Sequence, residues 1–133
     1  MPKIEIPESH RALLQLPVAT LATIGPDGRP QLSEVWFVAE GDTVRISLNS
    51  TRQKTKNLLR NPACTVFILD LSNPGRYLEI RGDAEITEDG GVLAGQVNAK
   101  YDANVSDHDH PGEQRFAVTI KPTRVNAVDM TAP

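Results

Sequence analysis

The sequence has few of the residues and motifs that common enzyme classes require. One cysteine, Cys64, in 133 residues excludes an internal disulfide and a cysteine-based metal cage. No G-x-S-x-G, H-E-x-x-H or P-loop motif is present, and no nucleophile and base pair is recognisable, so no catalytic side chain is assigned. No apolar run approaches the roughly 20 residues that a membrane-spanning helix needs, and the N-terminus lacks the apolar core of a signal peptide. We therefore expect a cytoplasmic protein without membrane attachment.

Aromatic residues and net charge are also sparse. Aromatics make up 5% of the chain, and the net charge is -3. An oligonucleotide-binding barrel needs several exposed aromatics beside basic residues, so a nucleic-acid partner is not expected. A chain of 133 residues is long enough for one core and too short for two, which predicts a single domain over residues 1–133.

The most informative feature that is present is a short helix with basic residues at its start. Ser50 and Thr51 are candidate N-caps, and Asn61-Pro62 ends the helix. Acidic residues are favoured in a first turn, yet this helix begins with basic ones: Arg52, Lys54 and Lys56. Backbone N–H groups and cations that converge at a helix start suit a phosphate. The alternative is a solvated basic helix surface.

The rest of the chain has the pattern of an antiparallel β protein. Turn signals such as Pro26-Asp27-Gly28 separate about six predicted strands, which include residues 18–24, 31–39, 43–48 and 63–71. A long strand at 76–87 is expected to bend at Gly82, and the last strand at 115–122 can continue past its proline. Short helices are predicted at 7–16, 50–60 and 90–100. This order indicates a mainly β (α+β) barrel whose first three strands form a meander.

Two of these strands predict a partner subunit. Residues 18–24 and 65–69 are apolar on both faces, which is more apolar surface than one small barrel can bury. We therefore expect a homodimer.

The segment Asp107-His108-Asp109-His110 allows two interpretations. Two imidazoles and two carboxylates could hold a metal if the loop folded around it. However, one short segment seldom supplies a closed coordination shell, and the adjacent Pro111-Gly112 indicates a turn. An exposed polar loop is favoured and no metal site is assigned, although the loop could cover the substrate end of a groove.

Several segments, in this order and spacing, resemble the pyridoxamine 5'-phosphate oxidase-like superfamily. They are Val18 to Thr23, Pro26 to Pro30, Val35-Trp36-Phe37, Ser50 to Leu58, Asn61-Pro62 and Tyr77 to Ala84. Within it, the chain is similar to the short flavin/deazaflavin oxidoreductases that use coenzyme F420. The resemblance implies a split β-barrel of the FMN-binding type, and a homodimer that holds its cofactor between the subunits.

The resemblance also implies where the cofactor binds. The family's phosphate site corresponds to Ser50, Arg52, Lys54 and Asn57, at the same helix start. Its ring site corresponds to Ser33, Val35 and Trp36, although Trp36 is equally well explained as a core aromatic. Asn49 could bond to the cofactor tail or hold the turn.

The function implied by the resemblance is hydride transfer between reduced coenzyme F420 and a small conjugated, electron-poor substrate. Such cofactors carry the reaction themselves, which explains the missing acid-base residues. One alternative is an FMN-binding oxidase of the pyridoxamine 5'-phosphate oxidase type, although this chain lacks the expected basic C-terminal segment. Another is a non-catalytic protein that binds F420, flavin or haem.

Overall fold

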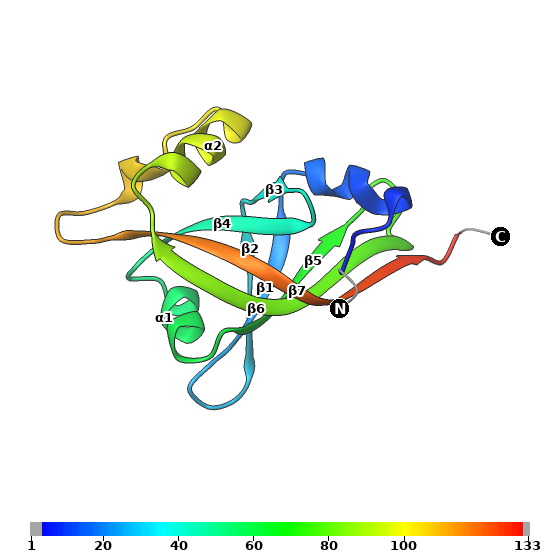
Figure 1. Ribbon diagram of the computed structural model, residues 1–133, viewed down its shortest axis with the longest axis horizontal. Coiled ribbons are helices and arrows are strands. Elements are labelled where there is room, and N and C mark those ends of the chain that lie inside the picture. The colour runs from blue at the N-terminus through cyan, green and yellow to red at the C-terminus, as the bar shows by residue number, and fades with distance from the viewer. Residues whose placement is uncertain (1–3, 132–133) are drawn as a thin grey trace.

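Seven antiparallel strands form one sheet in the order β2-β1-β5-β6-β7-β4-β3 (Figure 1). The computed structural model describes residues 4–131. The strands are β1 Ala19–Ile24, β2 Pro30–Val35, β3 Val38–Glu40, β4 Thr43–Asn49, β5 Ala63–Leu69, β6 Arg76–Glu88 and β7 Arg115–Asp129. The helices are α1 Gln53–Arg60 and α2 Val92–Tyr101, with the 3-10 helices η1 Glu8–Gln15 and η2 Val105–His108.

The predicted second strand over residues 31–39 is wrong, because two strands occupy it. β2 ends at Val35 and β3 begins at Val38, and these strands form the two opposite edges of the sheet. The break lies at Phe37, whose side chain is fully buried. Its backbone N–H donates to the Tyr101 hydroxyl at 2.9 Å, and its carbonyl accepts from Lys100 Nζ at 2.8 Å. Side chains of α2 thus satisfy the backbone groups that a continuous strand would have paired.

This break explains how the sheet closes. A link of two residues joins strands at opposite edges, so the sheet must curl until those edges approach each other. The predicted meander of three strands is wrong for the same reason, since β4 pairs with β3 and β7 and not with β2. The predicted hairpin between β1 and β2 is confirmed, with Gly28 at a φ of 81° in its turn.

The long strands β6 and β7 run side by side through the molecule (Figure 1). Their register shifts between Arg81 and Gly82, which confirms the predicted bulge. Gly82 faces Pro122 across the bulge. Pro122 has no N–H group to donate, and it lies where the hydrogen-bond ladder is already irregular. β7 therefore continues past the proline to Asp129, as the sequence allowed.

The core lies inside the curled sheet, and its largest fully buried side chains include Phe37, Leu21, Ile68, Leu78 and Ile120. Cys64 belongs to it, with 7% of its surface exposed. Burial raises the pKa of the Cys64 thiol to about 12, with a smaller effect from the charge of Asp83. The thiol therefore stays protonated and unreactive at neutral pH.

The helices lie around the sheet, and two of their features bear on the predictions. The segment predicted as a helix over 7–16 is the 3-10 helix η1, which buries His10, Leu13 and Leu14. The Asp89 carboxylate caps the start of α2 by accepting from the backbone N–H groups of Leu93 and Ala94. In the part of the chain that the structure describes, no helix is long and apolar enough to cross a membrane.

Candidate functional site

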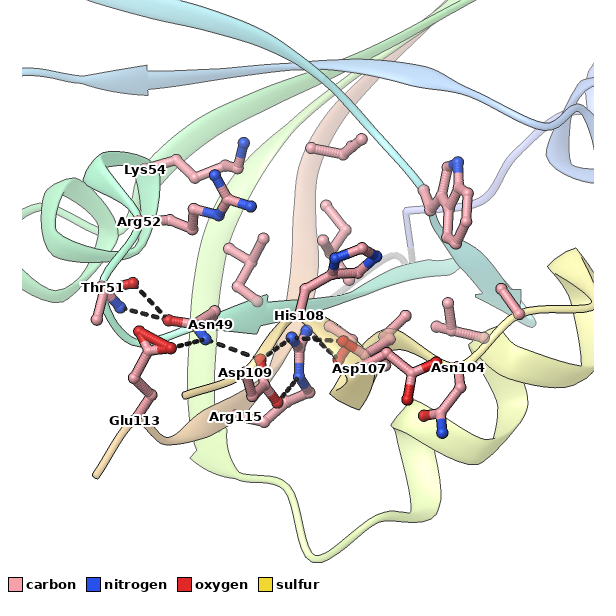
Figure 2. Close-up of a pocket in the computed structure, with 18 of the residues that line it drawn as sticks. Asn49, Thr51, Arg52, Lys54, Asn104, Asp107, His108, Asp109, Glu113 and Arg115 are labelled. Carbon is pink, nitrogen blue, oxygen red and sulfur yellow. Dashed lines mark hydrogen bonds and ion pairs between the residues drawn. The ribbon is translucent and has the colours of Figure 1, made fainter. Parts of the chain in front are cut away.

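A cavity of about 1030 Å³ opens between the start of α1, strand β4, the end of β2 and the segment from α2 to β7 (Figure 2). Its walls differ in character. Arg52 and Lys54 lie on the α1 side, whereas Ile46 and Val97 are among the apolar residues that line it. Segments that lie about sixty residues apart in the sequence thus share one cavity, which is large enough for a ligand of cofactor size.

Of the three cations that the sequence places at the start of α1, Arg52 and Lys54 lie on the wall of this cavity, and Lys56 does not. Lys54 Nζ donates to Ser33 Oγ at 3.1 Å, so Ser33 on β2 holds the ammonium in place. Burial, followed by the nearby charge of Arg52, lowers the pKa of Lys54 from its usual value. The Arg52 side chain is exposed and has no ion pair with any described residue. An anionic ligand would relieve the repulsion between these two cations.

The turn before α1 differs from the prediction in its capping. The helix begins at Gln53 with Arg52 at the N-cap position, and no side chain caps it. The predicted caps have other partners. Thr51 donates its N–H and its hydroxyl to Asn49 Oδ1 at 2.8 and 2.6 Å, and Ser50 Oγ accepts from the Gln114 N–H at 2.9 Å. The first N–H groups of α1 are therefore left without a capping side chain, beside Arg52 and Lys54.

Asn49 and Ser50 tie this turn to the loop before β7. The Asn49 side chain lines the cavity and donates to Asp109 Oδ1 at 2.8 Å. The Ser50 N–H donates to the Gln114 carbonyl at 2.7 Å. The bonds of the Asn49 side chain to Thr51 and Asp109 agree with its interpretation as a residue that holds the turn. Ser50 does not contribute to the cavity wall, because its hydroxyl is bonded to the loop.

Asn57, which the resemblance assigned to the phosphate site, does not reach the cavity. Its side chain is fully buried, and its Nδ2 donates at 3.1 Å to both Thr23 Oγ1 and Gln31 Oε1. Its Oδ1 accepts from Gln53 Nε2 at 2.8 Å. With these bonds Asn57 fixes α1 against the hairpin of β1 and β2, and so positions the cationic start of the helix.

Replacing Asn57 by alanine is expected to lower the free energy of unfolding by about 2 kcal/mol, because buried partners such as Thr23 lose their hydrogen bonds. Urea denaturation followed by circular dichroism measures the change. Gln53 is exposed, and Gln53→Ala removes only the partner of Asn57 Oδ1. This variant should lower the free energy of unfolding by well under half as much. An Asn57→Ala variant as stable as the wild type would contradict this supporting role.

The aromatic residue at the cavity is Trp36, in the link between β2 and β3. Its side chain is 43% exposed, so it is not a core aromatic, and it lines the cavity with Val35. The Trp36 ring stacks on Tyr101, with centroids 4.4 Å apart and an angle of 4° between the planes. Tyr101 was not identified from the sequence, because nothing local indicates that the end of α2 meets residue 36. The stack fixes the indole at one side of the cavity.

The loop from Val105 to Gln114 forms the remaining wall. Arg115 binds the carboxylate of Asp109 with two nitrogens and also donates to the Val105 carbonyl at 3.2 Å. Arg115, more than the bond from Asn49, lowers the pKa of Asp109 from its usual value. Asp109 is thus a structural partner in a loop that lines the cavity. Sequence reasoning missed Arg115, because an arginine at a strand start has no distinctive local pattern.

This arrangement suits binding more than acid-base chemistry. One wall offers two cations and uncapped backbone N–H groups for a phosphate, and an aromatic and aliphatic surface adjoins it for a ring. These residues fit a phosphate-bearing ring cofactor.

Comparison with known proteins agrees with this architecture. Over 91% of its length the chain is 35% identical to a solved structure named F420 Reductase, with a TM-score of 0.78 and 98% of that chain covered. A conserved hypothetical protein from Mycobacterium tuberculosis is 25% identical, with a TM-score of 0.77, over 97% of this chain and 88% of that one. General Stress Protein 26 from Bacillus anthracis is 19% identical, with a TM-score of 0.70, over 91% of this chain and 92% of that one. This likeness shows the fold alone.

The predicted split β-barrel is therefore confirmed, with seven strands in place of about six. The family described as Pyridoxamine 5'-phosphate oxidase matches residues 6–129, which is nearly the whole chain. The chain belongs to the pyridoxamine 5'-phosphate oxidase family.

Proposed function

We propose that this protein is an oxidoreductase that binds coenzyme F420 and transfers a hydride between the reduced deazaflavin and a small conjugated, electron-poor substrate. The observation that carries the proposal is the cavity of about 1030 Å³ with Arg52 and Lys54 on one wall and Trp36 on another. Among the similar structures, the 35% identical one named F420 Reductase supports a deazaflavin in place of FMN.

The roles of the residues follow from their positions. Arg52 and Lys54 would bind the phosphate, with Ser33 orienting the lysine ammonium. Val35 and Trp36 would lie against the ring, which needs apolar contact and exclusion of water. When bound, a deazaflavin supplies the hydride chemistry, and the protein is required only to bind and orient both partners.

The proposal includes a homodimer. Beside β1 and β5 lies a second groove with a mostly apolar lining, which includes Val18, Phe67, Leu69 and Leu71. Val18 is 37% exposed and Leu71 is 72% exposed, so this groove is more apolar than is usual for a surface in contact with solvent. A second subunit would cover it. Size-exclusion chromatography with light scattering should give twice the chain mass at micromolar concentration, whereas a monomer would count against the dimer.

The proposed cofactor can be tested through Trp36, because it is the one tryptophan of the sequence and lines the cavity. Titration with F420 is expected to quench its emission, with an affinity at least about tenfold higher than that of FMN in a parallel titration. Trp36→Phe removes the reporter. Equilibrium dialysis on that variant separates loss of signal from loss of binding.

Each outcome selects one function. Tight F420 binding, followed by turnover of reduced F420 with an enone or quinone, supports the reductase. Tight F420 binding without turnover of any such acceptor indicates a non-catalytic carrier. Tighter binding of FMN than of F420 would indicate an oxidase of the FMN-binding type. If the protein bound neither cofactor, the proposal would be overturned.

A further inference from the structure

His108 is one of the titratable side chains that line the cavity and to which the site described above gives no role. It lies at the end of η2, and Figure 2 shows its imidazole projecting into the cavity from the loop wall, away from the wall of Arg52 and Lys54. The side chain is exposed, and its ring nitrogens have no hydrogen-bond partner within residues 4–131. His10, in contrast, is buried and bonded through Nε2 to the Val128 carbonyl at 2.9 Å.

The backbone that carries His108 is fixed on both sides. The Val105 N–H donates to Asn98 Oδ1 at 2.8 Å, and the Asp109 carboxylate accepts from Asn49 and Arg115. These bonds attach η2 to α2, to β7 and to the turn that precedes α1. The backbone at His108 is therefore held in place, so that a ligand has to order only the side-chain torsions of the imidazole.

The surroundings of His108 define the ligand group that it can meet. Asp107, Asp109 and Glu113 give the loop three carboxylates, against one arginine, Arg115. A second anion is disfavoured at this wall, and a cation offers no acceptor for an imidazole N–H, which leaves a neutral hydrogen-bond acceptor. The cavity lies at the upper end of the range for a single ligand site, which leaves room for a small molecule beside a cofactor. A neutral imidazole retains one N–H donor, which suits a carbonyl oxygen.

We propose that His108 donates a hydrogen bond to the carbonyl oxygen of a neutral conjugated substrate at the loop end of the cavity. The inference rests on the proposed function for the identity of the reaction. The hydrogen bond orients the substrate and stabilises negative charge that develops on its oxygen. It also defines the substrate class as enones and quinones without a carboxylate or phosphate.

The test uses nuclear magnetic resonance of the three histidines, assigned with His108→Gln and His110→Gln variants. 2-Cyclohexen-1-one is titrated into the full-length protein, both alone and with oxidised F420, so that no turnover occurs. The His108 ring signals should shift with saturation, while those of buried His10 stay in place. His108→Phe should weaken enone binding about 3- to 10-fold, as expected for one neutral hydrogen bond. His108→Gln, which keeps an N–H donor, should restore part of the affinity.

The outcomes separate this inference from the proposed cofactor. Affinity for F420 should stay within about twofold of wild type in His108→Phe, since the cations lie on another wall. If F420 fails to bind but the enone still shifts His108, the cofactor assignment fails and the His108 contact stands. An enone that shifts only His110, or binds His108→Phe as tightly as wild type in both titrations, overturns the inference.

Discussion

Replacing both Arg52 and Lys54 by alanine is expected to weaken cofactor binding by about 2 to 4 kcal/mol, roughly 30- to 1,000-fold in the dissociation constant. Each cation that contacts a phosphate makes a charge-assisted hydrogen bond. We discount the sum because Arg52 is exposed and Lys54 is only partly buried. Titration of the variant with F420 and with FMN measures the loss.

The same helix provides a matched control for this double variant. Lys56 carries the same charge as Lys54 two residues further on, is exposed, and does not line the cavity. Lys56→Ala should therefore change the dissociation constant by less than about threefold, through long-range electrostatics alone. If the double variant bound the cofactor as tightly as Lys56→Ala does, the start of α1 would no longer be the phosphate site.

Replacing Gly82 by alanine is expected to lower the free energy of unfolding by about 3 kcal/mol. A Cβ at this position would lie 2.3 Å from the Lys121 carbonyl oxygen and 2.9 Å from its carbon. Both are backbone atoms of β7, so the bulge between the two longest strands must open to relieve the clash. Urea denaturation of the variant measures the effect.

Gly95 is the control for this substitution, because the same change meets no steric obstacle there. It lies on the exposed side of α2, and a Cβ added to it would have no atom within 4 Å. Gly95→Ala should raise the free energy of unfolding by about 0.5 to 1 kcal/mol, from helix propensity and a less flexible unfolded chain. A Gly82→Ala variant that is as stable as wild type would show that the bulge can accept a side chain.

Local chemistry in the sequence was sufficient for several features of this protein. The turn at Gly28, the bend at Gly82 and the cationic start of α1 all follow from properties of residues close together in the chain. Turn residues restrict backbone angles wherever they occur, and alternating apolar residues indicate strands. The β class, most of the strand positions and the group of cations at the start of α1 were therefore predictable.

The tertiary structure alone decided how these elements meet. The strand expected over 31–39 breaks at Trp36 and Phe37, because α2 supplies Tyr101 and Lys100 to the freed backbone. The cavity likewise needs Arg115 and Asp109 beside Asn49, sixty or more residues away in the chain.

Asn57 shows the same division at a single residue. The family resemblance assigned it to the phosphate site, but the packing of α1 on the β1–β2 hairpin turns it inward to Thr23 and Gln31. A local pattern specifies which side chains a helix carries. Which of them face a ligand depends on the surface against which the helix packs, and distant parts of the chain build that surface.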